Sequence, residues 1–192
     1  MTPGTHPILF SGEMVRAILA GRKTQTRRPV KLAPPWEIDE RDGAPWPRNW
    51  QWSQGDARSE WMRSPYRVGD RLYVRESYAP HYHGPGRHGY AADWTERAAD
   101  TVPRPRWTPS IHMRKAAARI WLEVVGVRVE RVRDISCADS LAEGMTTPRG
   151  GCIDGLHARA EFGRLWIDIY GADSWGLGYC WVYDFRRVEV AP

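Results

Sequence analysis

Residues 20–29, with the sequence AGRKTQTRRP, bring together the most chemically capable side chains of the chain. Lys23 supplies an amine, Thr24 and Thr26 supply hydroxyls, and Arg27 and Arg28 supply guanidiniums. Guanidiniums hold anionic or carbonyl oxygens, and an amine beside a hydroxyl can activate it as a nucleophile. The segment therefore predicts a site for a polar or anionic ligand, with acyl transfer as one chemistry within its reach.

Lys23 is subject to opposing influences. It follows a predicted helix, whose C-terminal end favours the protonated amine, whereas the neighbouring guanidiniums disfavour that form and lower the pKa of Lys23. A lowered pKa would let Lys23 take the proton of Thr26 and turn its hydroxyl into a nucleophile. A solvated Lys–Arg cluster explains the same residues, and the local sequence leaves both interpretations open.

Glu143 is placed against the field of its own helix. It lies in the last predicted turn, directly before Gly144, where unpaired carbonyls oppose negative charge. The carboxyl is therefore expected either to have a raised pKa, which suits a general acid or base, or to meet a cation such as Lys23. Glu is also a good helix former, and an exposed Glu143 without a function fits the local sequence as well.

Four further residues are weaker candidates for binding a ligand. Thr24 and Arg28 share a strand face with Thr26, so Arg28 can fix a carbonyl or phosphate oxygen beside the hydroxyls, or serve as an ordinary edge-strand cation. Glu76 follows two apolar strand positions and either lines a pocket or marks the end of the strand. His112 can hydrogen-bond a base, or pack at the boundary of an insertion.

Apolar periodicity predicts the elements that position these residues. They are helix 11–21, strand 24–30, strand 71–77, strand 120–129, helix 134–144, a helix that ends at Gly171, and strand 180–190. In the helix before Gly171, the residues predicted to share the buried face are Phe162, Leu165, Trp166 and Ile169. In strand 120–129 the alternation changes phase beside Gly126, which indicates a β-bulge that bends the strand around a small barrel. This order of elements predicts an α+β fold.

The chain of 192 residues, 42% of them hydrophobic, is expected to form one domain over 1–192. Two insertions interrupt it at about 31–66 and 79–108, and both are expected to be long loops because Pro, Gly and charge replace any periodicity. Several tryptophans lie within them, so we expect these loops to be ordered. They are Trp36, Trp46, Trp50, Trp52, Trp61 and Trp94.

Composition narrows the cellular setting and the partners. A net charge of +5 and a pI near 9.3 favour RNA, DNA or nucleotides as partners, although a solvated basic surface explains the same excess. Three widely spaced cysteines suit a reducing compartment. No signal segment or membrane-spanning run is seen, so a soluble cytoplasmic protein is expected. His81, His83 and His88 lack a nearby Cys, and we expect no metal and no other cofactor.

The spacing of Gly21, Lys23, Thr26 and Arg28 resembles the Gly-x-Lys-x-x-Thr-x-Arg signature of ASCH domains, which belong to the PUA-like superfamily. Other stretches are similar to phage and prophage ASCH-like proteins, namely 8–11, 69–76, 109–113, 134–136 and 142–144. The resemblance implies a small β-barrel flanked by helices, and it spans the domain apart from the two Trp/Pro-rich insertions.

Compact bacterial members of that family include an amidohydrolase acting on N(4)-acetylcytidine. The resemblance implies that Lys23, Thr26 and Glu143 form a catalytic set and that the substrate is a modified nucleoside or nucleobase. The alternative is a PUA-like module that binds RNA or modified DNA without hydrolysis. A third possibility is a ribonuclease in which Lys23 and Glu143 are the acid–base pair. The oligomeric state is not indicated.

Overall fold

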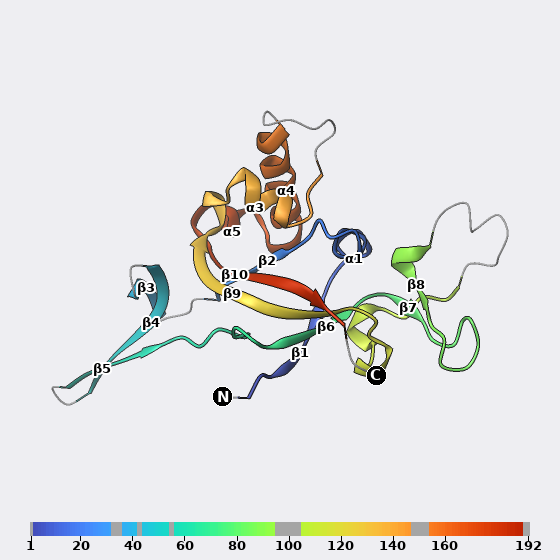
Figure 1. The fold of residues 1–192 in the computed structure, drawn as a ribbon. Helices are drawn as coiled ribbons and strands as arrows, with labels where there is room; N and C mark the ends of the chain where they lie inside the picture. The colour runs from blue at the N-terminus through green and yellow to red at the C-terminus, as the bar shows by residue number, and fades with distance from the viewer. Residues whose placement is uncertain are drawn as a thin grey trace.

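The computed structural model describes residues 2–31, 36–41, 44–53, 56–94, 105–146 and 154–189 (Figure 1). The strands are β1 (Thr5–Leu9), β2 (Gln25–Pro29), β3 (Trp36–Arg41), β4 (Ala44–Ser53), β5 (Asp56–Trp61), β6 (Arg71–Arg75), β7 (Tyr78–Ala79), β8 (Gly89–Tyr90), β9 (Trp121–Arg131) and β10 (Tyr179–Val188). The α-helices are α1 (Gly12–Leu19), α3 (Cys137–Ala142), α4 (Asp154–Tyr170) and α5 (Ala172–Leu177). Four short 3-10 helices are η1 (Ala91–Asp93), η2 (Ser110–His112), η3 (Lys115–Ala117) and η4 (Val132–Asp134).

Five strands form a mixed central sheet in the order β1-β6-β9-β10-β2. β1 runs parallel to β6, and the other neighbours are antiparallel. The predicted α+β class and the position of β2 at an edge are confirmed. The expected barrel is not found, because β1 and β2, at the two ends of this order, do not pair within the described residues. A side chain bridges them instead, since Arg28 Nη2 donates to the Leu9 carbonyl at 2.9 Å.

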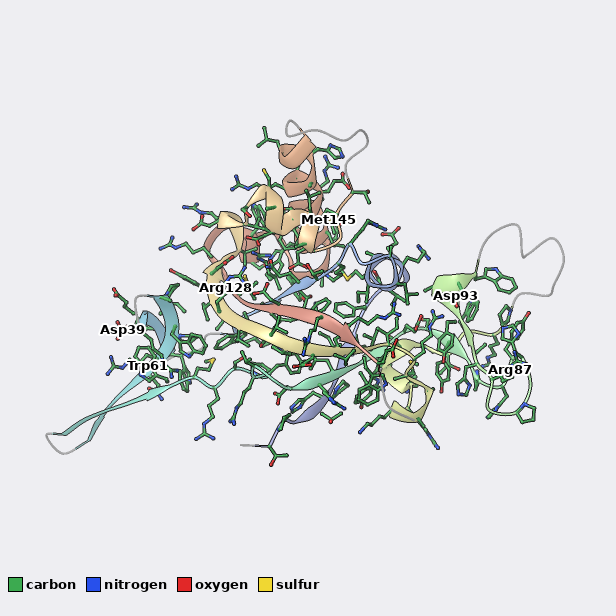
Figure 2. The ribbon with its side chains drawn as sticks, viewed as in Figure 1. Asp39, Trp61, Arg87, Asp93, Arg128 and Met145 are labelled. Atoms are coloured by element: carbon green, nitrogen blue, oxygen red, sulfur yellow. The ribbon has the colours of Figure 1, made fainter. Side chains whose placement is uncertain are left out.

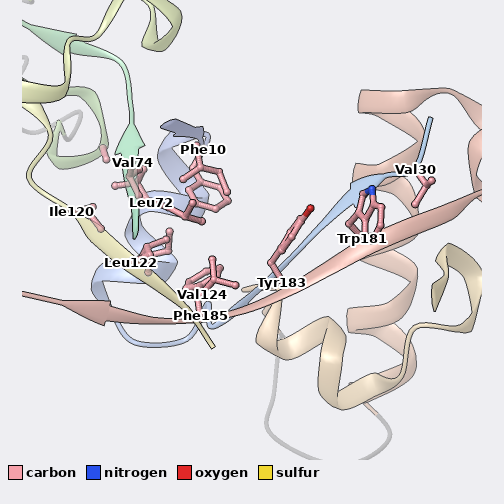
Figure 3. Close-up of a cluster of buried hydrophobic side chains, with 14 of the residues drawn as sticks. Phe10, Val30, Leu72, Val74, Ile120, Leu122, Val124, Trp181, Tyr183 and Phe185 are labelled. Carbon is pink, nitrogen blue, oxygen red and sulfur yellow. The ribbon is translucent and has the colours of Figure 1, made fainter. Parts of the chain in front are cut away.

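Two of the three core clusters of the described residues lie on opposite faces of β10, because successive strand residues point to opposite sides. Trp181, Tyr183 and Phe185 join the larger cluster, which α1 covers and Figure 3 shows. Cys180 and Val182 face the other way, into a cluster with Phe162 and Trp166 of α4. Figure 1 shows α3, α4 and α5 gathered on this second side. The two faces therefore present different environments to the neighbouring edge strand β2.

The phase change in β9 is a β-bulge, as predicted. Asp184 of β10 pairs with Gly126, and the next residue, Phe185, pairs with Val124, so Val125 has no partner and is 47% exposed. Gly126 leaves room for the side chain of Asp184, because a Cβ there would lie 2.7 Å from Asp184 Oδ2 and 3.3 Å from Asp184 Cβ. The bulge lets the apolar residues on both sides of it reach the same core from a strongly curved strand (Figure 1).

Within the first insertion, the prediction of a loop is wrong for residues 36–41, 44–53 and 56–61, which are strands. β3, β4 and β5 form an antiparallel sheet there. Pro45 and Pro47 hid the strand pattern, since proline normally argues against a strand. Both prolines pair with β3, and both lie before Arg48, where the pairing of β4 with β5 begins. Because β5 does not pair with this part of β4, the missing N–H groups cost no hydrogen bond to β5. Trp46 docks this sheet on the core, with its ring 4.9 Å from that of Trp181.

The second insertion contains the short β7–β8 pair and η1, while residues 95–104 lie outside the described part.

The C-terminal helices also differ from prediction. Phe162 and Trp166 are buried as expected, but Ile169 is 52% exposed, because Ala158 completes a buried i, i+4, i+8 row instead. The additional helix α5 follows Gly171, whose φ of +85° ends α4. No helix in the described ranges has the length and apolarity to cross a bilayer.

We expect Cys180 to resist thiol reagents in the folded protein. Burial raises the pKa of Cys180 to about 12, so its reactive thiolate is scarce at pH 8, whereas Cys137 is partly exposed. In a Cys152→Ser variant, Ellman's reagent should modify one thiol quickly in buffer and two in urea. Equal rates for both thiols in buffer would contradict the packing of β10 against α4.

Candidate active site

Lys23 is held where the end of α1 meets the end of α3. Gly21, with φ of +70°, turns the chain, and the N–H of Lys23 bonds back to the Ala17 carbonyl at 3.1 Å. The next amide, that of Thr24, donates to the Ala142 carbonyl at 2.8 Å. The segment after α1 and the end of α3, which are far apart in the sequence, are thus joined by a backbone hydrogen bond as well as by side chains.

Gly144 allows this close approach. Its φ is +91°, and a Cβ there would lie 2.9 Å from the Cβ of Ala17 and 3.1 Å from that of Lys23. Any other residue would push α1 and α3 apart. α3 begins later than the predicted start at 134, because Val132–Asp134 forms the separate 3-10 helix η4. Ser136 caps α3, since its hydroxyl accepts from the Asp139 N–H at 3.0 Å, and the helix ends with Glu143 at its C-cap. Helix start and stop together bring Glu143 to Lys23.

The two side chains form a buried ion pair. Lys23 Nζ donates to Glu143 Oε2 at 2.7 Å, to the Glu143 carbonyl at 2.8 Å and to the Gln25 carbonyl at 2.8 Å. All three ammonium protons therefore have acceptors. The side chains are 0% and 3% exposed. The predicted alternative in which Lys23 neutralises Glu143 is confirmed, and the exposed Lys–Arg cluster and the exposed Glu143 are excluded.

Burial lowers the pKa of Lys23, and Arg28 and Arg27 lower it further, while the Glu143 carboxylate acts in the opposite direction. The amine is consequently easier to deprotonate than an exposed lysine. A proton can also pass directly along the 2.7 Å hydrogen bond to Glu143, which converts the ion pair into a neutral amine and a carboxylic acid. The pair thus combines a potential base with a potential acid.

Arg27 extends the pair into a larger charged network. Its side chain is fully buried, donates to Glu130 at 2.8 Å, and lies 3.4 Å from both Asp139 and Glu143. It also bonds Gln25, whose amide donates to Asp139 at 3.1 Å. Gln25, Glu130 and Asp139 were not predicted as residues of the site. The alternation of strand side chains could have indicated them. Gln25 and Arg27 alternate with the threonines, so both point to the same face of the strand and are expected to share polar partners there.

Thr26 and Arg28 project from the opposite face of β2. They pair with Tyr183 and Trp181, which belong to the larger core cluster. Thr26 is 1% exposed, and its hydroxyl has no hydrogen bond to any described residue. The ring of Phe10 connects this face to the ion pair, because Lys23 Nζ and the Arg28 guanidinium each lie 5.4 Å from its centre. The Thr26 hydroxyl therefore forms no hydrogen bond with the ammonium, and Phe10 is the side chain that links the two faces.

A pocket of about 450 Å³ adjoins Glu143 between three helical segments. One wall is the start of α1, another is the end of α3, and the third is α4. Its lining residues are Ser11, Glu13, Met14, Arg16, Arg22, Glu143, Gly144, Met145, Thr146, Glu161 and Leu165. Neither Lys23 nor Thr26 is among them, so Glu143 is the member of the expected catalytic set that borders this pocket.

The remaining predicted binding residues lie elsewhere. Thr24 is exposed just before β2. Glu76 is buried against Arg119, which it meets through two hydrogen bonds of 2.9 and 3.0 Å, and burial raises the pKa of Glu76. His112 is exposed in η2. No contact among the described residues joins Glu76 or His112 to Lys23 and Glu143, so the structure does not gather them into one site.

Within the described residues, no group of three or more His, Cys, Asp or Glu side chains is arranged to hold a metal ion. Comparison of this chain with family models, with curated proteins and with solved structures gave no match, so the pairing of Lys23 with Glu143 is the observation on which assignment of the site rests.

Proposed function

We propose that this protein is an ASCH-like amidohydrolase that removes the acyl group from N(4)-acylated cytosine nucleosides. One observation carries the proposal: Lys23 and Glu143, which are 120 residues apart in the sequence, meet at 2.7 Å in a buried pair. The family resemblance requires Lys23 and Glu143 to meet in one site. The local sequence at the two positions does not require it. The open sheet with its bulged strand β9 is, in this proposal, the counterpart of the family's barrel.

Thr26 would supply the nucleophile. Proton transfer to Glu143 leaves Lys23 as a neutral amine, which then takes the hydroxyl proton of Thr26. The freed oxygen attacks the amide carbonyl, and the Arg28 guanidinium beside Phe10 faces the oxyanion that develops. For this step Lys23 must exchange one of its two carbonyl acceptors for the hydroxyl of Thr26.

Glu143 would complete the reaction. The carboxylic acid gives its proton to the departing N(4) amine as the C–N bond breaks, which leaves the acyl group esterified to Thr26. Water, deprotonated by the same pair, then hydrolyses the ester and releases a carboxylic acid. The sum is amide plus water giving amine plus acid, so no redox partner and no metal enters the balance.

The pocket beside Glu143 fits a substrate of this class. Its volume of about 450 Å³ lies within the range of small-molecule sites, and Arg16 and Arg22 offer donors to carbonyl or hydroxyl oxygens. In this proposal the substrate enters from the pocket and reaches Thr26 past Glu143.

The test is a panel of N(4)-acylated cytidines and deoxycytidines, followed by the ultraviolet change of deacylation and by release of free carboxylate. At least one member should be hydrolysed with a rate that is nearly independent of salt, because the substrate carries no phosphate. The kcat/KM should fall as pH rises through the pKa of Lys23, which lies below 10.5, because the pair then lacks the proton that Glu143 delivers to the departing amine. A panel without any turnover would exclude the proposed activity.

A further inference from the structure

A second concave surface lies on the other side of the central sheet from α4. It is a pocket of about 640 Å³ between the β3–β5 sheet, the segment 62–68 and the middle of β9. Val127 and Val129 form part of its floor, and Figure 2 places Trp61 on the β3–β5 sheet and Arg128 on the curved strand β9. None of the residues proposed for hydrolysis lines it, so its function can be tested separately.

The charges at this pocket are of one sign. Arg41, Arg63, Arg67 and Arg128 line it, and none of its lining residues is Asp or Glu. Arg128 already pairs with Glu130 and Asp184, each at 2.5 Å, so its charge is largely compensated. The side chain of Arg63 is exposed and forms no ion pair with any described residue. The surface therefore favours an anionic ligand.

Aromatic rings stand beside these arginines. The Arg41 guanidinium lies 5.2 Å from the ring centre of Trp46 and 5.8 Å from that of Trp61, so planar cations and indoles alternate. Trp46 is fixed in position because it donates to the Met62 carbonyl at 2.9 Å, and Tyr66 because it donates to the Pro7 carbonyl at 3.0 Å. The ring centre of Trp61 lies 4.8 Å from a second guanidinium, that of Arg48. Aromatic rings that are already fixed before binding lose little conformational entropy when a flat ligand stacks on them.

The concave surface continues beyond this pocket. An adjoining pocket of about 300 Å³ shares Ser64, Arg67 and Val68 with it and reaches His6 and the carboxylate of Asp70. A ligand longer than one nucleotide can therefore follow the segment 62–68 from one pocket to the next. A double helix cannot use the rings in this way, since its bases are stacked on each other and enclosed.

We infer that this surface binds single-stranded nucleic acid, with bases stacked on Trp61 and Trp46, the two rings beside Arg41, and phosphates held by Arg63 and Arg67. Positive charge alone would fit an acidic peptide equally well. The alternation of guanidiniums and indoles favours bases, which have a flat face at every position along the strand. The proposal does not depend on the hydrolytic activity.

The experiment is fluorescence anisotropy of labelled 12-residue oligo-uridylate and oligo-thymidylate, with a 12-base-pair duplex and an oligo-glutamate peptide as competitors. Both single strands should bind, and affinity should fall about tenfold or more between 50 and 200 mM salt. The ratio of the two affinities tells whether RNA or DNA is the preferred source of the strand. The duplex and the peptide should compete at least tenfold more weakly.

Three variants and one matched control locate the binding. Trp61→Ala should weaken binding about 5- to 100-fold, whereas Trp61→Phe keeps a stacking ring and should retain most of the affinity. Arg63→Glu should weaken binding about tenfold and reduce the salt dependence. Arg114→Glu is the matched control, because this substitution changes the charge by the same amount as Arg63→Glu. Arg114 is exposed and does not line the pocket. The control should change the affinity less than twofold.

Four results would overturn the proposal: no binding at 50 mM salt, a duplex that competes as well as a single strand, a peptide that does so, or equal losses from Arg63→Glu and Arg114→Glu. The Trp61→Phe result decides the role of stacking even if the alanine variant folds poorly. Thr26→Val should bind oligonucleotide as the wild type does, so loss of hydrolysis and loss of binding remain distinguishable.

Discussion

Lys23→Met is expected to lower the free energy of unfolding by about 3–5 kcal/mol, because it removes one member of a buried ion pair and leaves the other charged. The Glu143 carboxylate would then retain only Arg27, at 3.4 Å, and the carbonyls of Gln25 and Glu143 would each lose a donor. Urea denaturation measures the loss. Lys31→Met is the matched control, since Lys31 is exposed and should change stability by less than about 0.5 kcal/mol.

The same pair can be examined with a double-mutant cycle. Glu143→Gln keeps an acceptor for the ammonium and should cost less than Lys23→Met. The double variant should cost at least about 1 kcal/mol less than the sum of the single variants, since no isolated charge remains. Simple additivity, or a Lys23→Met variant as stable as the control, would contradict the buried contact.

The stability difference between wild type and Lys23→Met should also depend on pH. Burial lowers the pKa of folded Lys23 below its usual value of 10.5, so the unfolded chain binds more protons in the window between the two values. The desolvation cost of the ammonium is present below the folded pKa and is relieved as pH rises through this window. The advantage of the wild type should consequently grow with pH there.

Thr26→Val is expected to reduce kcat/KM for the best acyl-cytidine substrate by at least about 10³-fold, because it removes the proposed nucleophile and preserves the shape of the side chain. Glu143→Gln should cost about 10²- to 10⁴-fold as a loss of general acid–base catalysis. Thr24→Val provides the control. It changes the same functional group two residues away, at an exposed position, and should leave the rate within about twofold.

Mass spectrometry of the quenched enzyme should find the acyl group on the peptide that carries Thr26. A Thr26→Val enzyme with wild-type turnover would show that water attacks the substrate directly, and would remove Thr26 from the mechanism. Thermal unfolding of each variant separates loss of catalysis from loss of fold. Because Thr26 is buried on the core face of β2, this check is needed for the valine variant in particular.

Local patterns were sufficient where one residue type has one physical role. Ser11 and Ser136 cap α1 and α3, and Gly21 and Gly144 follow the ends of those helices with positive φ, as their positions predict. The phase change beside Gly126 likewise marks the bulge, since a strand has no other way to shift its apolar face. Each of these features depends on a few neighbouring residues.

Local patterns failed where a distant partner changes what a residue can do. A proline such as Pro47 normally argues against a strand. It is tolerated here because Pro47 pairs with β3 and lies outside the part of β4 that pairs with β5. Glu76 could not be assigned because Arg119, its partner, is 43 residues away. Ile169 has the right helical spacing for the core, but the position of α4 on the sheet turns it outward.

Sequence patterns were enough to predict the α+β class, the glycines that follow α1 and α3, and the residues of the first segment that carry chemical groups. Tertiary structure alone decided that Lys23 and Glu143 bury each other's charge, that Thr26 faces the aromatic core, and that arginines and indoles from the β3–β5 sheet gather beside β9. The physical reason is range. Capping and alternation act over three or four residues, whereas burial and charge pairing depend on which segments the packed sheet brings together.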